Sequence, residues 1–103
     1  MKGFDIMKDL KLKKFLLENG VENVDNVRTI HLFGIVYDDD VVLHHSVNCF
    51  DELYDYIHEF DYQRVMIIFK NGGSVAWDTD PDYLRKELDN IVNMNILTTT
   101  FVN

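Results

Sequence analysis

The sequence has a single cysteine, Cys49, among its 103 residues. One cysteine cannot form an internal disulfide, which favours a reducing compartment, and we expect a cytoplasmic protein. No apolar run approaches the roughly eighteen residues that a membrane-spanning helix needs. Residues 1–14 lack the uninterrupted apolar stretch of a secretory signal. These absences predict a soluble intracellular chain without membrane association.

Lysine and arginine are absent from Thr29 through Gln63, a stretch that holds eight acidic residues. The whole chain has a formal net charge of −8, although residues 1–28 contain six of its ten cations. Binding to the phosphates of DNA or RNA requires cations that displace counterions, so direct nucleic-acid binding is not expected. The same field would steer a basic protein toward the chain.

The length and an apolar fraction of 47% fit one globular domain, residues 1–103. Hydrophobic periodicity predicts the order α-ββα-ββα-β. The expected elements are a helix over 4–19, strands over 27–37 and 41–47, a helix over 49–60, strands over 63–70 and 74–78, a helix over 81–94 and a strand over 96–102. Two hairpin–helix units in tandem predict an α+β fold, a mainly antiparallel sheet with helices packed on one face.

Local signals set several boundaries. Asn48 is the expected N-cap of the second helix, with Asp51 at its third position. Asn71–Gly72 predicts the second hairpin turn, and Pro81 suits the first position of the third helix. In the first helix, the residues expected to face the core are Phe4, Met7, Leu10, Phe15 and Leu17. The strand over 27–37 is apolar on both faces, which predicts a strand covered on both sides or central in its sheet.

The stretch NCFDELYDYIHEFDY, residues 48–62, contains five carboxylates and three tyrosines and no lysine or arginine. On a helix, Asp51, Asp55 and Glu59 lie at i, i+4 and i+8, with neighbours about 6 Å apart on one ridge. Like charges at this spacing destabilise a helix slightly, which favours a functional surface. The candidate partner-binding residues are Asp51, Glu52, Asp55, Tyr56, Glu59, Asp61 and Tyr62, with Asp38, Asp39 and Asp40 in the preceding turn. Tyr56 and Tyr62 are expected to be exposed anchors.

Three other interpretations compete with this one. The acidic ridge is also what a merely solvated helix face would show. A self-associating domain would form a homodimer through apolar surfaces such as the edge strand expected over 96–102. A cysteine- or metal-dependent enzyme would use Cys49 and the four histidines, which are His31, His44, His45 and His58. The spacing of these residues matches no common zinc motif, so no metal and no cofactor are predicted.

Taken together, these patterns predict a small, acidic, non-catalytic binding protein. Its expected partner is a basic protein that handles nucleic acid, and the presented carboxylates would occupy the surface that normally meets phosphates. Inhibitors of nucleases, such as antitoxins and phage anti-defence proteins, are the functional class that this charge and size allow.

Overall fold

The computed structural model describes residues 9–36 and 41–102. Its elements are α1 (Leu10–Glu18), a short 3₁₀ turn η2 (Val24–Asn26), β1 (Val27–Val36), β2 (Val41–Val47), α2 (Phe50–Glu59), β3 (Arg64–Phe69), β4 (Ser74–Asp78) and α3 (Pro81–Val102). The order α-ββα-ββα confirms the predicted α+β class and both hairpin–helix units. None of the helices in these ranges has the length and apolarity that crossing a lipid bilayer requires.

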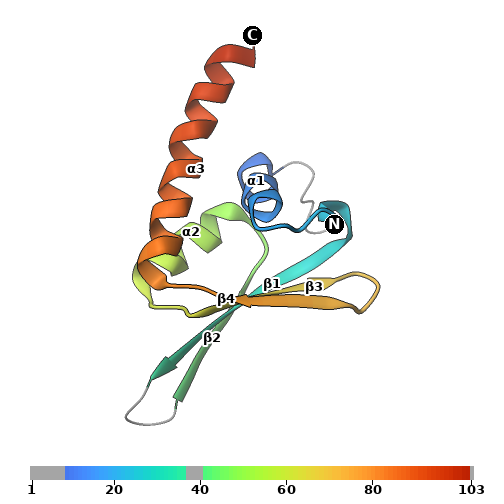
Figure 1. Cartoon of the computed structure of the whole chain (residues 1–103), viewed down its shortest axis with the longest axis vertical. Coiled ribbons are helices and arrows are strands. Elements are labelled where there is room, and N and C mark those ends of the chain that lie inside the picture. Colours follow the sequence, from blue (N-terminus) through green and yellow to red (C-terminus); the bar gives the residue numbers. More distant parts are fainter. Residues whose placement is uncertain (1–8, 37–40, 103) are drawn as a thin grey trace.

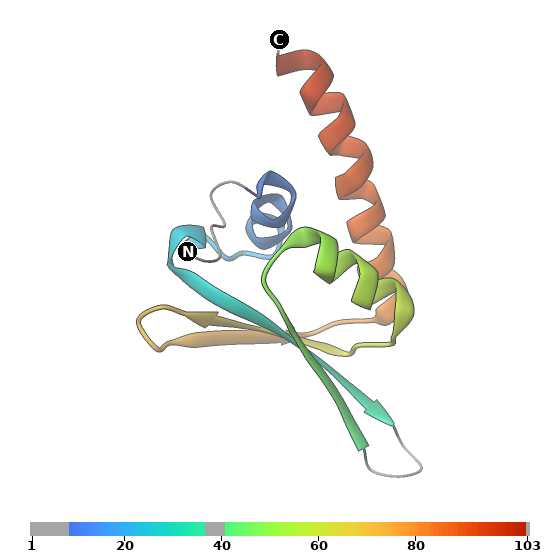
Figure 2. The same cartoon turned by 180° about the vertical axis from the view of Figure 1, so that it is seen from behind.

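The four strands form one antiparallel sheet in the order β2-β1-β3-β4. All three α-helices lie on the same face of this sheet, as two opposite views show (Figures 1 and 2). The prediction that β1 is central is therefore confirmed. Its alternative, a strand covered on both faces, is wrong, because within the described ranges no helix lies on the second face.

The core lies between the sheet and the helices. Strand side chains alternate between the two faces, and the buried ones on the helix side include Ile30, Leu32, Val65 and Ile67. The helices contribute buried leucines and isoleucines, among them Leu12, Leu16, Leu53, Ile57, Leu84 and Leu88. Trp77 of β4 is partly buried beside Phe15, with ring centroids 6.4 Å apart, and lies at the edge of the core.

The apolar stripe predicted for the first helix is right at Phe15 and wrong at Leu10 and Leu17. Leu10 and Leu17 are 66% and 47% exposed, whereas Leu12, Phe15 and Leu16 are buried. Phe4 and Met7 lie outside the described residues. Residues 12, 15 and 16 have the i, i+3, i+4 spacing of one helix face. Periodicity alone therefore allows this face to point toward the core as well as it allows the predicted one. The face with Leu12, Phe15 and Leu16 is buried because it is the one that packs on the sheet.

The third helix begins as predicted and ends later than predicted. Asp80 Oδ2 accepts hydrogen bonds from the backbone N–H groups of Asp82 and Tyr83, both at 3.1 Å, and Pro81 is the first helical residue. The helix then continues to Val102, so the strand expected over 96–102 is wrong. No glycine or proline follows Pro81 to stop the helix. The threonines of residues 98–100 favour strand only weakly, and the continuing helix overrides that preference.

The second hairpin confirms its prediction. β3 and β4 pair from Arg64↔Asp78 to Ile68↔Ser74, and the chain reverses through residues 70–73. Gly72 has φ of +94°, a left-handed conformation that glycine adopts without strain. The side chain of Asn71 accepts a hydrogen bond from the Gly73 N–H at 2.9 Å, which fixes the turn.

Candidate partner-binding surface

The N-terminus of α2 is capped from two places, and neither is the predicted cap. Cys49 occupies the N-cap position and its side chain makes no capping bond. Asp9, which precedes α1, accepts a hydrogen bond through Oδ2 from the Phe50 N–H at 2.8 Å. Glu52 Oε1 accepts from the Asn48 N–H at 2.9 Å. The prediction of Asn48 as N-cap is wrong, because its side chain instead meets the hydroxyl of Thr29.

The outward face of α2 carries four exposed acidic residues. Phe50, Leu53 and Ile57 are buried and define the inner face of the helix. The acidic residues Asp51, Glu52, Asp55 and Glu59 are exposed on the other side, and we call them the α2 acidic face. Within the described part of the chain, Asp51, Asp55 and Glu59 make no hydrogen bond or ion pair, while Glu52 has only the bond to Asn48. The predicted ridge is thus present and unneutralised.

One flank of this face is tied to α3. His58 faces an acceptor at each ring nitrogen: its Nδ1 donates to the Tyr54 carbonyl oxygen at 2.8 Å, and its Nε2 lies 3.0 Å from Asp89 Oδ1. The hydroxyl of Tyr54 also donates to Asp89 at 2.9 Å. That hydrogen bond raises the pKa of Tyr54. Asp89 therefore anchors two residues of α2, and its negative charge extends the acidic surface onto α3.

The other flank is aromatic. The ring of Tyr56 stacks on His45 of β2 with centroids 4.2 Å apart and planes at 23°. Phe60 stacks against the same imidazole, with centroids 5.3 Å apart. Tyr56 is half-buried rather than fully exposed, so one side of its ring is held in place beside the acidic face.

Tyr62 was expected to be an exposed anchor, and this is wrong. The residue is 1% exposed, and its hydroxyl lies 2.5 Å from His45 Nδ1. Burial, followed by the neighbouring Tyr56 and Glu59, raises the pKa of Tyr62 to about 12. The alternation of the sequence after α2 gave no sign of this, because the burial depends on β2 crossing beneath the helix end. Tyr62 is a core residue and cannot contact a partner.

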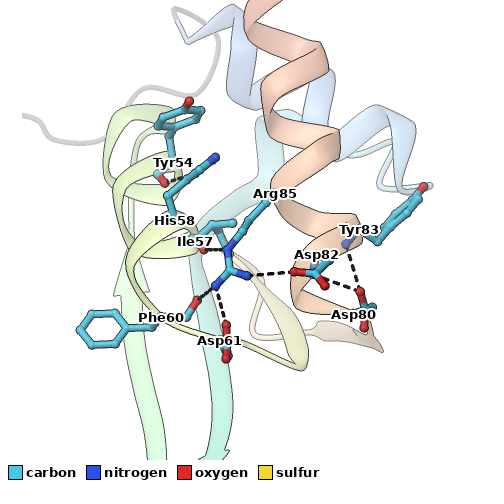
Figure 3. A network of polar contacts seen from close by, with 9 residues as sticks. All are labelled: Tyr54, Ile57, His58, Phe60, Asp61, Asp80, Asp82, Tyr83 and Arg85. Atoms are coloured by element: carbon cyan, nitrogen blue, oxygen red, sulfur yellow. Dashed lines mark hydrogen bonds and ion pairs between the residues drawn. The ribbon is translucent and has the colours of Figure 1, made fainter.

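Asp61 is engaged within the molecule. Its carboxylate forms an ion pair with Arg85 of α3, whose guanidinium also reaches the carbonyl oxygens of Ile57 and Phe60 (Figure 3). Arg85 Nη1 contacts Asp82 as well, at 3.2 Å. Sequence reasoning missed Arg85, because only Asp82, three residues before it, is a partner that sequence spacing could identify. Asp61 is therefore neutralised, unlike the acidic residues of α2.

Three of the predicted contact residues, Asp38, Asp39 and Asp40, lie outside the described residues. The remaining predicted contact residues fall into two groups. The structure brings Asp51, Glu52, Asp55 and Glu59 together with Tyr56 at their side, and it separates Asp61 and Tyr62 from them by pairing and by burial.

The histidines and the cysteine do not converge. His44 and His45 point to opposite faces of the sheet, as their adjacency in a strand predicts, since His44 contacts His31 and His45 contacts Tyr62. Cys49 is a partly buried free thiol at the start of α2. Over residues 9–36 and 41–102, no group of three or more His, Cys, Asp and Glu side chains is arranged to hold a metal ion.

Comparison of the chain with models of protein families, with curated proteins and with solved structures found no match.

Proposed function

We propose that this chain is a small acidic binding module that occupies the basic, nucleic-acid-handling surface of another protein, in the manner of a nuclease inhibitor. The observation that carries the proposal is the α2 acidic face, where Asp51, Asp55 and Glu59 are exposed and lack a cationic partner in the described residues. Exposed acids on ordinary helices are commonly relieved by interleaved lysines, and here none is present.

The arrangement suits a phosphate-binding partner. Neighbouring carboxylates on one helix ridge are about 6 Å apart, which is comparable with the spacing of phosphates along a strand once lateral offset is added to the rise of about 3.4 Å. The ridge is rigid, because α2 is anchored at its start by Asp9 and at its end by Arg85. A preorganised array loses less conformational entropy on binding than one built on a flexible tail.

The supporting contacts differ from those expected from sequence alone. Tyr56 would supply an aromatic contact at the rim of the acidic face, because one side of its ring is fixed against His45. Aromatic rings beside charged residues are common in protein interfaces. The proposed contact set is therefore Asp51, Glu52, Asp55, Tyr56 and Glu59, without Asp61 and Tyr62.

The test compares two variants of equal net charge. The ridge variant carries Asp51→Asn, Asp55→Asn and Glu59→Gln. The control variant carries Glu18→Gln, Glu22→Gln and Asp25→Asn, three exposed acids near α1 and η2. Tagged wild-type, ridge and control proteins are used to retain partners from the lysate of the native host, at low and high salt and with added DNA or RNA.

We expect the wild-type and control proteins to retain the same basic protein at low salt, and high salt or nucleic acid to release it. The ridge variant should no longer retain this basic protein at low salt. Equal retention by a folded ridge variant, or a partner whose binding is insensitive to salt, would rule the proposal out.

A further inference from the structure

The face of the sheet opposite the helices is bare in the described structure, and its side chains follow the strand register. One cross-strand row is His44–Phe33–Arg64–Asp78, and the next is Ser46–His31–Met66–Ala76. We call these eight residues the bare sheet face. Phe33 and Met66 are only partly exposed, yet they are not among the residues packed against the core. Phe33, Met66 and Ala76 are the apolar members of this otherwise polar face, which no described element covers.

Two imidazoles meet on this face. His31 Nδ1 lies 2.7 Å from His44 Nε2, and the ring planes differ by 17° with centroids 4.9 Å apart. These values fit two rings that meet edge to edge through their nitrogens and share one proton. Both atoms are imidazole nitrogens, which are preferred ligands of Zn²⁺ and Cu²⁺.

Neighbouring side chains act on both imidazoles of the pair. Phe33 lies against His44 with centroids 4.8 Å apart and planes at 16°, which fixes the orientation of that ring. Burial, and after it the charges of His44 and Arg28, lowers the pKa of His31.

A tetrahedral zinc site needs four ligands, and this cluster supplies two. Within the described residues, no further His, Cys, Asp or Glu side chain joins the pair. The ligand set is thus half complete, which points to a second set of donors brought by whatever covers the bare sheet face.

The charge of this face identifies the covering molecule. The chain as a whole is at −8, so two copies repel each other over most orientations. The bare sheet face carries one carboxylate, Asp78, and Arg64 neutralises it through a 2.7 Å ion pair. It is thus a near-neutral surface of mixed polar and apolar residues, on which two copies can approach. A two-fold axis through it would place both histidine pairs together, since such an interface joins the same patch of both copies.

We propose that the bare sheet face binds a second copy of this chain, and that His31 and His44 of the two copies together form a four-imidazole site for a transition metal such as Zn²⁺. Facing sheets pack about 10 Å apart, a gap that side chains from both sheets fill. A metal midway between them, with bonds of about 2.0–2.1 Å to nitrogen, is within reach of imidazoles projecting from each sheet. Zinc would replace the N–H···N hydrogen bond of each pair, and each imidazole would stay neutral, with its proton on the ring nitrogen that does not bind the metal.

The test measures molecular mass by light scattering, and bound zinc by elemental analysis, for the full chain in chelator and with added Zn²⁺. We expect a monomer in chelator, and with zinc a doubled mass and one zinc per two chains. His31→Gln and His44→Gln should each abolish both changes. His58→Gln is the matched control, because His58 lies on the helix side and should leave both unchanged.

A further variant tests the face itself. Met66→Lys keeps both histidines and places a positive charge in the middle of the bare sheet face, so it should prevent the zinc-dependent dimer. The ridge variant of α2 should dimerise with zinc like the wild type, which separates this site from the acidic face. A monomer binding one zinc, a dimer that forms equally in chelator, or zinc-dependent dimerisation by Met66→Lys would each overturn the proposal.

Discussion

Arg85 of α3 donates a hydrogen bond from Nε to the carbonyl oxygen of Ile57, 2.9 Å away in the last turn of α2. Its Nη2 donates to the carbonyl oxygen of Phe60 at 3.0 Å. The last carbonyl groups of a helix lack partners within the helix, so Arg85 caps α2 from a neighbouring element. This contact fixes the end of the helix that presents the acidic face.

Replacing Arg85 by lysine should therefore destabilise the fold. One ammonium group cannot reproduce the planar set of donors that reaches two carbonyls and two carboxylates. We expect the free energy of unfolding in urea to fall by about 1–3 kcal/mol. Lys86→Arg, at the adjacent exposed position, is the control and should change it little. Matching urea curves for Arg85→Lys and the wild type would show that the cap does not contribute.

Asp9 caps two helices, so its replacement should lower the stability of the fold through both. Its Oδ1 accepts from the Leu12 N–H at 3.2 Å, which caps α1, and its Oδ2 accepts from the Phe50 N–H at 2.8 Å, which caps α2. Asp9→Ala should lower the free energy of unfolding by about 1–2 kcal/mol. Asp9→Ser should recover only part of this, because one hydroxyl can cap α1 without reaching Phe50.

The control for Asp9 is Asp25→Ala, which removes an exposed carboxylate in the short turn before β1. Its free energy of unfolding should stay within about 0.5 kcal/mol of the wild type. If Asp9→Ser unfolded at the same urea concentration as the wild type, the bond between Asp9 and Phe50 would have no energetic role.

These two residues also show where sequence reasoning ends. The hairpin at Asn71–Gly72 and the start of α3 at Asp80–Pro81 were predictable, because each signal lies within four residues of the structure it causes. The contacts of Asp9 with Phe50 and of Arg85 with Ile57 span 41 and 28 residues. Their partners are backbone groups, which every residue has, so no residue type marks them in advance.

The candidate site was predictable for a related reason. The period of 3.6 residues alone places Asp51, Asp55 and Glu59 opposite the buried face of α2, and this prediction was confirmed. The ion pairing of Asp61 and the burial of Tyr62 depend on how the segment after α2 crosses β1 and β2. This tertiary arrangement has no local signal in the sequence. The bare sheet face was not predicted, because β1 has apolar residues on both of its sides. This pattern does not indicate which side the helices cover.

Gly34 is expected to tolerate no side chain. A Cβ atom at this position of β1 would clash with the carbonyl oxygen of Asp61, a backbone atom that cannot rotate away. The same crossing is held by the Gln63 N–H, which donates to the Phe33 carbonyl at 2.7 Å. Gly34→Ala should lower the free energy of unfolding by about 1–3 kcal/mol. Gly73→Ala, whose Cβ would meet the side chains of Asn71 at 3.3 Å and of Phe69 at 4.0 Å, should cost less in the same urea titration. Equal costs would contradict the close approach.

Tyr62 should make stability fall in alkali. Its pKa is raised to about 12, chiefly by burial, whereas a tyrosine in an unfolded chain titrates near about 10. Above pH 10 the unfolded chain therefore loses this proton while the folded chain keeps it, and ionisation favours unfolding. The contribution is fully present below about pH 10 and is lost as the pH rises toward 12.

Tyr62→Phe removes the titrating group, so the difference in unfolding free energy between the wild type and this variant should shrink or reverse between pH 9 and pH 11.5. At pH 8 the variant should be the less stable protein by about 0.5–1.5 kcal/mol, because His45 loses its hydrogen-bond partner. Tyr83→Phe, at a residue that is 62% exposed, is the control and should follow the wild-type profile across this range. A constant difference between Tyr62→Phe and the wild type at every pH would mean that the phenol ionises equally easily in both states, which its burial forbids.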